Sequence, residues 1–175
     1  MRLSGIIVVS DTSPLTALLI VGEENLLPRV FTEVVIPEAV QKELLCNHAQ
    51  LPAWLRIAKV QNAAQAGLYS KIIDAGEAET IELAQELHAD RLLINERKGR
   101  KLAMQEGVAV VGLLGVVLLA KTKALTTSGR TLIERLDWEA ACKSPLRFEL
   151  WRSKRWANSV TKVQRAFIRL SIGKS

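Results

Sequence analysis

Short runs of apolar, mostly β-branched residues alternate along the chain with segments whose apolar positions recur at helical spacing. The runs at 6–10, 34–36, 91–94 and 108–111 are continuous, which is typical of strands buried on both faces of a parallel sheet. The segment 55–60 fits a short strand or an edge element. These runs predict the strands of one sheet.

Predicted helices follow the apolar runs. Ser13 as the N-cap and Pro14 at the first helical position predict a helix that ends near Val21. The clearest helical pattern spans 76–87. The other predicted helices span 37–45, 63–73, 97–105, 113–123 and, with a weaker pattern, 131–141. Because strands and helices alternate up to residue 111, we predict an α/β fold, a three-layer α/β/α sandwich around a central, mainly parallel sheet.

Length and composition limit the chain to one ordinary domain. Its 175 residues are 49% hydrophobic, which is enough for one core. Cys46 and Cys142 lie far apart and match neither a metal-binding spacing nor a disulfide framework. The apolar segment 113–120 is closed by Lys121 and is too short to span a bilayer, and the N-terminus does not match a signal peptide. We therefore expect a soluble, cytoplasmic protein with no membrane contact.

Positive charge is concentrated at the C-terminal end. The net charge is +6, but residues 143–175 carry nine Lys or Arg against one acid, Glu149, so the preceding part is slightly acidic. A basic segment suits RNA, an acidic protein partner or simply a solvated end. We expect residues 1–125 to form the α/β domain. Residues 126–175 would form a helical, basic extension that is not an independent domain.

Acidic residues stand next to several of the predicted strands. Asp11 follows the first run, Glu43 lies on the helix after the second, and Glu77 and Glu79 begin the helix at 76–87. Glu96 follows the run at 91–94. Strand ends and first helical turns of a parallel sheet converge on one edge, so these carboxylates would meet in space. Such a cluster is costly without a divalent cation, which indicates Mg²⁺- or Mn²⁺-dependent phosphodiester chemistry.

The same segments carry a family resemblance. In order along the chain they are 9–15 (VSDTSPL), 36–44 (IPEAVQKEL), 76–79 (GEAE) and 92–100 (LLINERKGR). Together they resemble a PIN domain, most closely the short prokaryotic branch related to VapC-type toxins, over roughly residues 6–125. The resemblance implies a metal-dependent endoribonuclease that is the toxin of a toxin–antitoxin pair. It also implies an RNA substrate, an antitoxin partner and a homodimer, for which the apolar segment 113–119 offers a surface.

The resemblance also assigns roles to individual residues. The implied catalytic acids are Asp11, Glu43, Glu77 and Glu96, and the implied metal ligands are Asp11, Glu77, Glu79, Asn95 and Glu96. Glu77 and Glu79 point about 200° apart on a helix, so only one is expected to face the site. Thr12 and Ser13 match hydroxyl residues that support the first acid. Arg97, Lys98, Arg100 and Lys101 form either a phosphate-binding edge or an exposed helix face.

One departure from the family pattern leaves a second function open. Members of this branch usually carry two Asp where this chain has Asn95 and Glu96. If Glu96 is the fourth acid, activity survives with an altered metal preference. If Asn95 holds that position, the chain is a weakened PIN-like module that binds RNA or an antitoxin without cutting. A third reading is a flap-nuclease-like or phosphatase-like enzyme that acts on DNA.

Overall fold

One parallel sheet organises the chain. The computed structural model describes residues 5–126 and 129–142. In these ranges the strands are β1 (Ile7–Ser10), β2 (Glu33–Pro37), β3 (Leu55–Ala58), β4 (Arg91–Leu93) and β5 (Val110–Val111). Their order across the sheet is β3-β2-β1-β4-β5, and every neighbouring pair is parallel. Val9 in the central strand is in register with Val35 on one side and Leu92 on the other.

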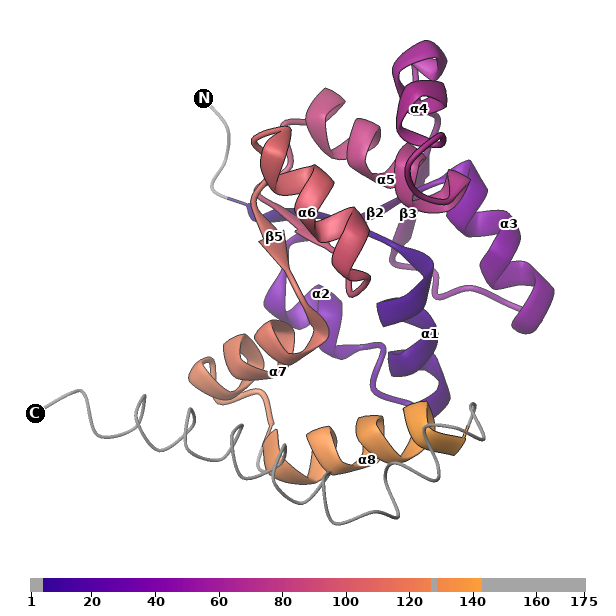
Figure 1. The fold of residues 1–175 in the computed structure, drawn as a ribbon. Helices are drawn as coiled ribbons and strands as arrows, with labels where there is room; N and C mark the ends of the chain where they lie inside the picture. The colour runs from indigo at the N-terminus through magenta and orange to yellow at the C-terminus, as the bar shows by residue number, and fades with distance from the viewer. Residues whose placement is uncertain (1–4, 127–128, 143–175) are drawn as a thin grey trace, which may run out of the picture. The chain divides into compact units, whose positions relative to one another are not determined.

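Helices cover both faces of this sheet. They are α1 (Thr12–Val21), α2 (Leu26–Val30), α3 (Glu38–Asn47), α4 (Ala63–Tyr69), α5 (Ala75–Glu86), α6 (Arg97–Gln105), α7 (Leu113–Thr122) and α8 (Gly129–Cys142). In Figure 1, α4, α5 and α6 lie on one side of the sheet, and α1, α2 and α7 lie on the other. The predicted three-layer α/β/α sandwich with a parallel sheet is confirmed.

The helix α5 is the main element of its layer. It packs against β1, β2 and β4. Its own residues Ala78, Ile81 and Ala84 are almost fully buried in the core between the helix and the sheet. This burial explains why 76–87 had the clearest helical pattern, and the helix begins one residue earlier, at Ala75. Because its axis is fixed on three strands, α5 is a rigid base for the side chains of its first turn.

Two local predictions were wrong. Ser13 is not the N-cap of the first helix: α1 begins at Thr12, and Asp11 caps it by accepting a hydrogen bond from the Ser13 N–H at 3.5 Å. Asp11 can do this because its backbone is extended at the end of the strand. The short helix α2 was not predicted, since five residues carry too little pattern and its burial against other elements stabilises it.

The C-terminal part of the chain is only partly described. The chain divides into two units, residues 1–133 and 134–175, and α8 runs across this boundary where a helix at 131–141 was predicted. The basic segment 143–175 lies outside the described residues, so the prediction of a basic extension from residue 126 stays a prediction. Among the helices in the described ranges, none is long and apolar enough to cross a membrane.

Candidate active site

The candidate site lies where the chain changes direction across the sheet. From β1 the chain runs outward through β2 to β3, and it then returns to β4 on the other side of β1. In open α/β sheets, ligands bind outside the carboxyl ends of the strands at this kind of switch point. Asp11 follows β1 directly, and Glu96 follows β4 after two residues. The strand order therefore brings two residues together that are far apart in sequence.

Asp11 is fixed at the junction of β1 and β4. Its N–H donates to the carbonyl of Leu93 at 2.9 Å, and its side chain is only 5% exposed. The pKa of the Asp11 carboxyl is raised from 3.8 to about 6, mainly by burial. Backbone hydrogen bonds from Thr12 and Ser13 oppose this rise, and the nearby carboxylates of Asp74 and Glu43 add to it. A buried carboxyl with a raised pKa is poised either to keep a proton or to bind a cation.

Glu77 is the second buried carboxyl. It lies in the first turn of α5, is 3% exposed, and has its pKa raised from 4.5 to about 7, mainly by burial and then by Asp74, Asp11 and Glu96. A Cβ built on Gly99 of α6 would stand 2.9 Å from Oε1 of Glu77. The bare backbone of α6 thus lies directly against this carboxyl.

Glu43 reaches the same region from α3. Its Oε2 accepts a hydrogen bond from the Thr12 hydroxyl at 2.5 Å. A Cβ built on Gly76 would stand 2.9 Å from Glu43 Oε1 and 3.4 Å from Asp74 Oδ1, so these two carboxylates face one point beside α5. The structure therefore gathers five acids, which we call the acidic cluster: Asp11, Glu43, Asp74, Glu77 and Glu96.

Asp74 is a member of this cluster that sequence reasoning missed. It is the N-cap of α5, and its Oδ1 accepts a hydrogen bond from the Glu77 N–H at 2.8 Å. An Asp three residues before a Glu at a helix start resembles a capping box, and that spacing could have identified it. Asp74 thus helps to orient the first turn of α5 and adds negative charge next to Asp11 and Glu77.

Two predicted metal ligands have other partners. Glu79 Oε2 accepts a hydrogen bond from the Ala39 N–H at 3.2 Å, at the beginning of α3. Asn95 Oδ1 accepts one from the Leu113 N–H at 3.0 Å, at the beginning of α7. Each side-chain oxygen accepts a hydrogen bond from a backbone N–H in the first turn of a helix. The N-cap residues of these two helices form no side-chain cap bond of their own. Both residues stay predictions as ligands, but the structure does not bring them into the acidic cluster.

The supporting residues act differently from each other. Thr12 bonds through its hydroxyl to Glu43, and thereby ties the start of α1 to α3. Ser13 contributes its backbone N–H to Asp11. Any residue except proline could supply that second bond, so the hydroxyl of Ser13 is not required for it.

We expect Glu79→Ala to loosen α3 and Glu79→Gln to leave it in place. Pro37, the N-cap of α3, has no capping side chain. The side chain of Glu79, which lies on α5, caps α3 in its place. Loss of such a cap costs about 1 kcal/mol, and the amide oxygen of Gln can replace the carboxylate. Urea unfolding and cation titration of both variants check this. Equal loss of cation affinity in Gln and Ala variants would instead mark Glu79 as a ligand.

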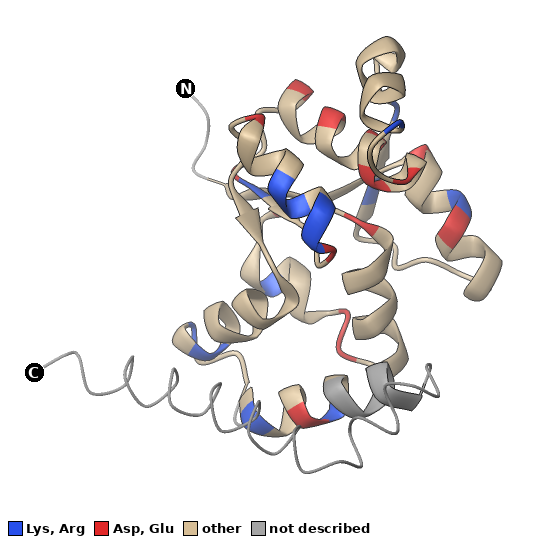
Figure 2. Ribbon diagram, in the orientation of Figure 1, with Lys and Arg blue, Asp and Glu red and all other residues tan. Residues whose placement is uncertain are grey.

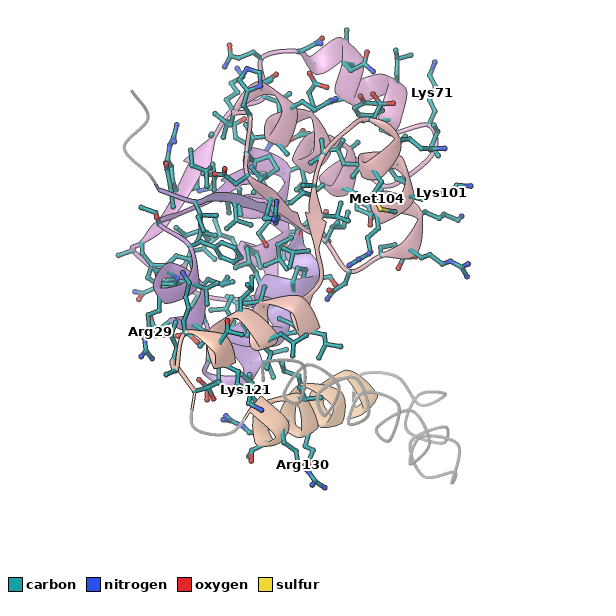
Figure 3. The ribbon with its side chains drawn as sticks, turned by 90° about the vertical axis from the view of Figure 1, so that its left-hand side faces the viewer. Arg29, Lys71, Lys101, Met104, Lys121 and Arg130 are labelled. Carbon is teal, nitrogen blue, oxygen red and sulfur yellow. The ribbon has the colours of Figure 1, made fainter. Side chains whose placement is uncertain are left out.

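Basic side chains line the neighbouring helix. Figure 2 shows Lys and Arg gathered on α6 and acidic residues on α3 and α5. Arg97, Lys98 and Lys101 are exposed, and Lys101 projects from α6 on the same side as Lys71, which follows α4 (Figure 3). Arg100 is half-buried instead, and its Nη1 donates to the carbonyl of Ile94 at 3.2 Å. Arg100 therefore helps to hold the end of β4.

We expect Gly99→Ala to destabilise the protein, although alanine favours helices. The new Cβ would stand 2.5 Å from Cδ1 of Ile94, which is fully buried, and close to Glu77. Overpacking of this kind costs about 1–3 kcal/mol. Gly67 of α4 is the matched control, because a Cβ there has nothing within 4 Å, so Gly67→Ala should stabilise by roughly 0.5–1 kcal/mol. Urea unfolding measures both; a stabilising Gly99→Ala would contradict the packing.

The chemistry of the acidic cluster suits a hard divalent cation. Mg²⁺ and Mn²⁺ prefer carboxylate oxygens, and the largest charge effects on Asp11 and Glu77 come from other carboxylates. As the side chains stand, no three His, Cys, Asp or Glu residues in the described ranges are grouped so that they could hold a metal ion. Glu43 and Glu96 are exposed, and a turn of these two side chains toward the buried pair would complete such a group.

Comparison with known proteins identifies the family. A family model described as a PIN domain matches residues 7–145, which is most of the chain. The chain belongs to the PIN-domain family. The acidic cluster of this PIN domain thus lies in a nuclease-like module of the hydrolase class, in a family that generally uses divalent metal ions. No curated protein matches the chain.

Proposed function

We propose that this PIN domain is a metal-dependent endoribonuclease. One observation carries the proposal: two carboxyls from different elements, Asp11 and Glu77, are both nearly fully buried with raised pKa values at the switch point of the sheet. Burial of two such groups without a cation is costly for folding. Folds retain this cost at functional sites, where it is relieved when a cation binds.

The proposed cofactor is Mg²⁺ or Mn²⁺. Asp11 and Glu77 would be its buried ligands, and Glu43 and Glu96 would be ligands from the solvent-exposed side. Asp74 would orient Glu77 through the α5 cap. A bound divalent cation supplies a Lewis acid that activates water and stabilises negative charge on the phosphate. This assignment makes the acids at both strand ends catalytic, as the family resemblance implied.

The basic face of α6 is the proposed contact for the RNA backbone. Arg97, Lys98 and Lys101 are exposed beside the acidic cluster, and side chains of this type position a polyanion without reading its sequence. Arg100 would act indirectly, since it is bonded to the carbonyl of Ile94. The resemblance to VapC-type toxins supports a role as the toxin of a pair, with an antitoxin as protein partner.

Cleavage assays with matched RNA and DNA test the proposal. The full chain is incubated with single-stranded RNA and with DNA of the same sequence, in Mg²⁺, in Mn²⁺ and in EDTA. We expect RNA to be cut internally in either metal and to stay intact in EDTA. Cleavage of DNA alone would favour the flap-nuclease-like alternative, and cleavage that persists fully in EDTA would overturn metal dependence.

The second candidate is a PIN domain that binds without cutting. Its support is Asn95, a neutral residue at a position where the family usually has Asp. The side-chain oxygen of Asn95 already accepts the Leu113 N–H at the start of α7. RNA binding by fluorescence anisotropy with no turnover in any metal would favour this candidate. A gain of turnover in Asn95→Asp would then identify the missing charge as the cause.

We also propose a homodimer through α7. Leu114 and Leu119 are large apolar side chains that remain 41% and 37% exposed on this helix. Exposed apolar residues on one helix favour contact with another protein surface. Sedimentation of the wild type and of Leu114→Glu tests this state.

A further inference from the structure

A groove beside the acidic cluster is not used by the proposed chemistry. It has a volume of about 300 Å³, at the small end of ligand pockets. The lining residues are Glu38, Lys59, Val60, Ala63, Ala66, Gly67, Ser70, Ala75 and Glu79. They come from the N-terminal parts of α3 and α5, from α4 with its C-cap residue, and from the segment that leads into α4. All of these elements belong to the first unit of the chain.

The groove and the acidic cluster share two helices. Glu38 lies on α3, the helix of Glu43, and Ala75 stands between Asp74 and Gly76 at the start of α5. Glu79 lines the groove from the side of α5 opposite to Glu77. Through Ala75 the edge of the groove thus lies next to Glu43 and Asp74, because a Cβ built on the adjacent Gly76 would stand 2.9 Å and 3.4 Å from their carboxylate oxygens.

Small residues make up much of the lining of the groove. Ala63, Ala66 and Ala75 present single methyl groups, and Gly67 presents none, with no atom within 4 Å of a Cβ built there. A lining of small side chains leaves the face of α4 open to a planar group that lies against it.

The polar lining offers both acceptors and donors. Glu38 and Glu79 carry carboxylates, and Glu79 uses only Oε2 for the Ala39 N–H. Lys59 is the donor, since the Ser70 hydroxyl already donates to the carbonyl of Gly67 at 2.9 Å. Two carboxylates exclude a phosphate by repulsion, whereas they accept hydrogen bonds from neighbouring N–H groups of one ligand.

We propose that this groove binds a guanine base of the RNA, next to the phosphate that is cut. This inference rests on the proposed ribonuclease function and adds its base preference. The Watson–Crick edge of guanine carries N1–H and N2–H donors for the carboxylates and the O6 acceptor for Lys59. Adenine offers no such adjacent pair of donors together with an acceptor.

A cationic side chain of a protein partner fits the lining less well. Arginine would satisfy Glu38 and Glu79, but it carries no acceptor for Lys59 and its charge opposes that of the ammonium group. The mixture of acceptors and a donor is thus better matched by a base than by a cation. We therefore assign the groove to the substrate.

Binding and cleavage of matched oligonucleotides test the inference. The substrates are uridine oligoribonucleotides that each carry one guanosine, inosine or adenosine. Their affinity for the protein is measured by fluorescence anisotropy in EDTA, and the kcat/KM of their cleavage is measured in Mg²⁺. We expect guanosine to be preferred over adenosine by tenfold or more, and inosine, which lacks the 2-amino group, to lie between them. Glu38→Gln should reduce this preference without a comparable loss of affinity for polyuridine.

A blocked groove provides the matched pair of variants. Gly67→Leu would fill the groove from α4, whereas Ala64→Leu places the same side chain at an exposed position of α4 outside the lining. We expect the guanosine preference to disappear in Gly67→Leu and to persist in Ala64→Leu. Circular dichroism checks that both variants fold. If Gly67→Leu does not fold, the loss of preference in Glu38→Gln tests the groove instead.

The outcomes separate this inference from the proposed function. A guanosine preference in binding that Glu38→Gln reduces, without cleavage in any metal, supports the groove and overturns the nuclease. Cleavage with no preference among the three bases overturns the groove and leaves the nuclease. If N-acetylarginine amide shifts the NMR signals of Gly67 and Ser70 while guanosine monophosphate does not, the groove belongs to a protein partner and the inference is wrong.

Discussion

Replacing Asp11 with asparagine should lower RNA cleavage by about 100-fold or more, with the fold intact. Asp11 is buried where β1 meets β4, and the hydrogen bond from its N–H to the Leu93 carbonyl fixes its backbone, so its carboxylate is held at the site. Loss of even an outer partner of a metal ligand costs roughly 10–100-fold in affinity or activity, and loss of a ligand should cost more. Asparagine still offers an oxygen to the Ser13 N–H, so it preserves the cap of α1. Initial rates in Mg²⁺ and calorimetric titration with Mn²⁺ measure the effect.

Ser13→Ala is the control for this substitution. Its hydroxyl is exposed, and the contact with Asp11 runs through the backbone N–H, which alanine retains. We expect its activity to stay near that of the wild type. If Asp11→Asn cleaves RNA and binds Mn²⁺ as well as the wild type does, the acidic cluster is not the catalytic centre.

The metal-free protein should lose stability as the pH rises from about 4 to 7. Folding raises the pKa of Asp11 from 3.8 to about 6 and that of Glu77 from 4.5 to about 7, so the folded state binds more protons than the unfolded state in this window. Stability therefore falls with rising pH, and each pKa unit corresponds to about 1.4 kcal/mol. Urea unfolding in EDTA at pH 5, 6, 7 and 8 measures the combined loss, which we expect to be a few kcal/mol.

A divalent cation should reverse this loss at high pH. The cation competes with protons for the same carboxyls, so its affinity should rise between pH 6 and 8 and proton release should accompany binding. Other titrating groups cancel when the wild type is compared with Asp11→Asn at each pH. We expect the variant to become relatively more stable in EDTA as the pH rises. A constant difference from pH 5 to 8 would contradict the burial of a charged Asp11.

Much of the fold was predictable because local pattern and tertiary burial agree. The continuous apolar runs at 6–10, 34–36 and 91–94 became β1, β2 and β4, since strands buried on both faces need such runs. The helix at 76–87 was equally clear because one face of α5 packs on three strands. The predictions failed where few residues carry a pattern: α2 was not predicted, and the strand predicted at 108–111 is only the two-residue strand β5.

The candidate site was predictable only in part. Asp11 and Glu77 follow directly from acidic residues at a strand end and a helix start, and the structure places them in one cluster with Glu43 and Glu96. Asp74 was missed because a helix cap looks like a local feature until Glu77 is seen to be buried beside it.

The sequence by itself determined the alternation of strands and helices, the acids at their junctions and membership of the PIN-domain family. Only the tertiary structure decided the strand order, which sets β4 beside β1 and so brings Glu96 toward Glu77. It also decided that Glu79 bonds to the start of α3, 40 residues away, and Asn95 to the start of α7, 18 residues away. The physical reason is that hydrogen-bond partners and burial, which set these roles and the pKa values, depend on distances in space that no local pattern encodes.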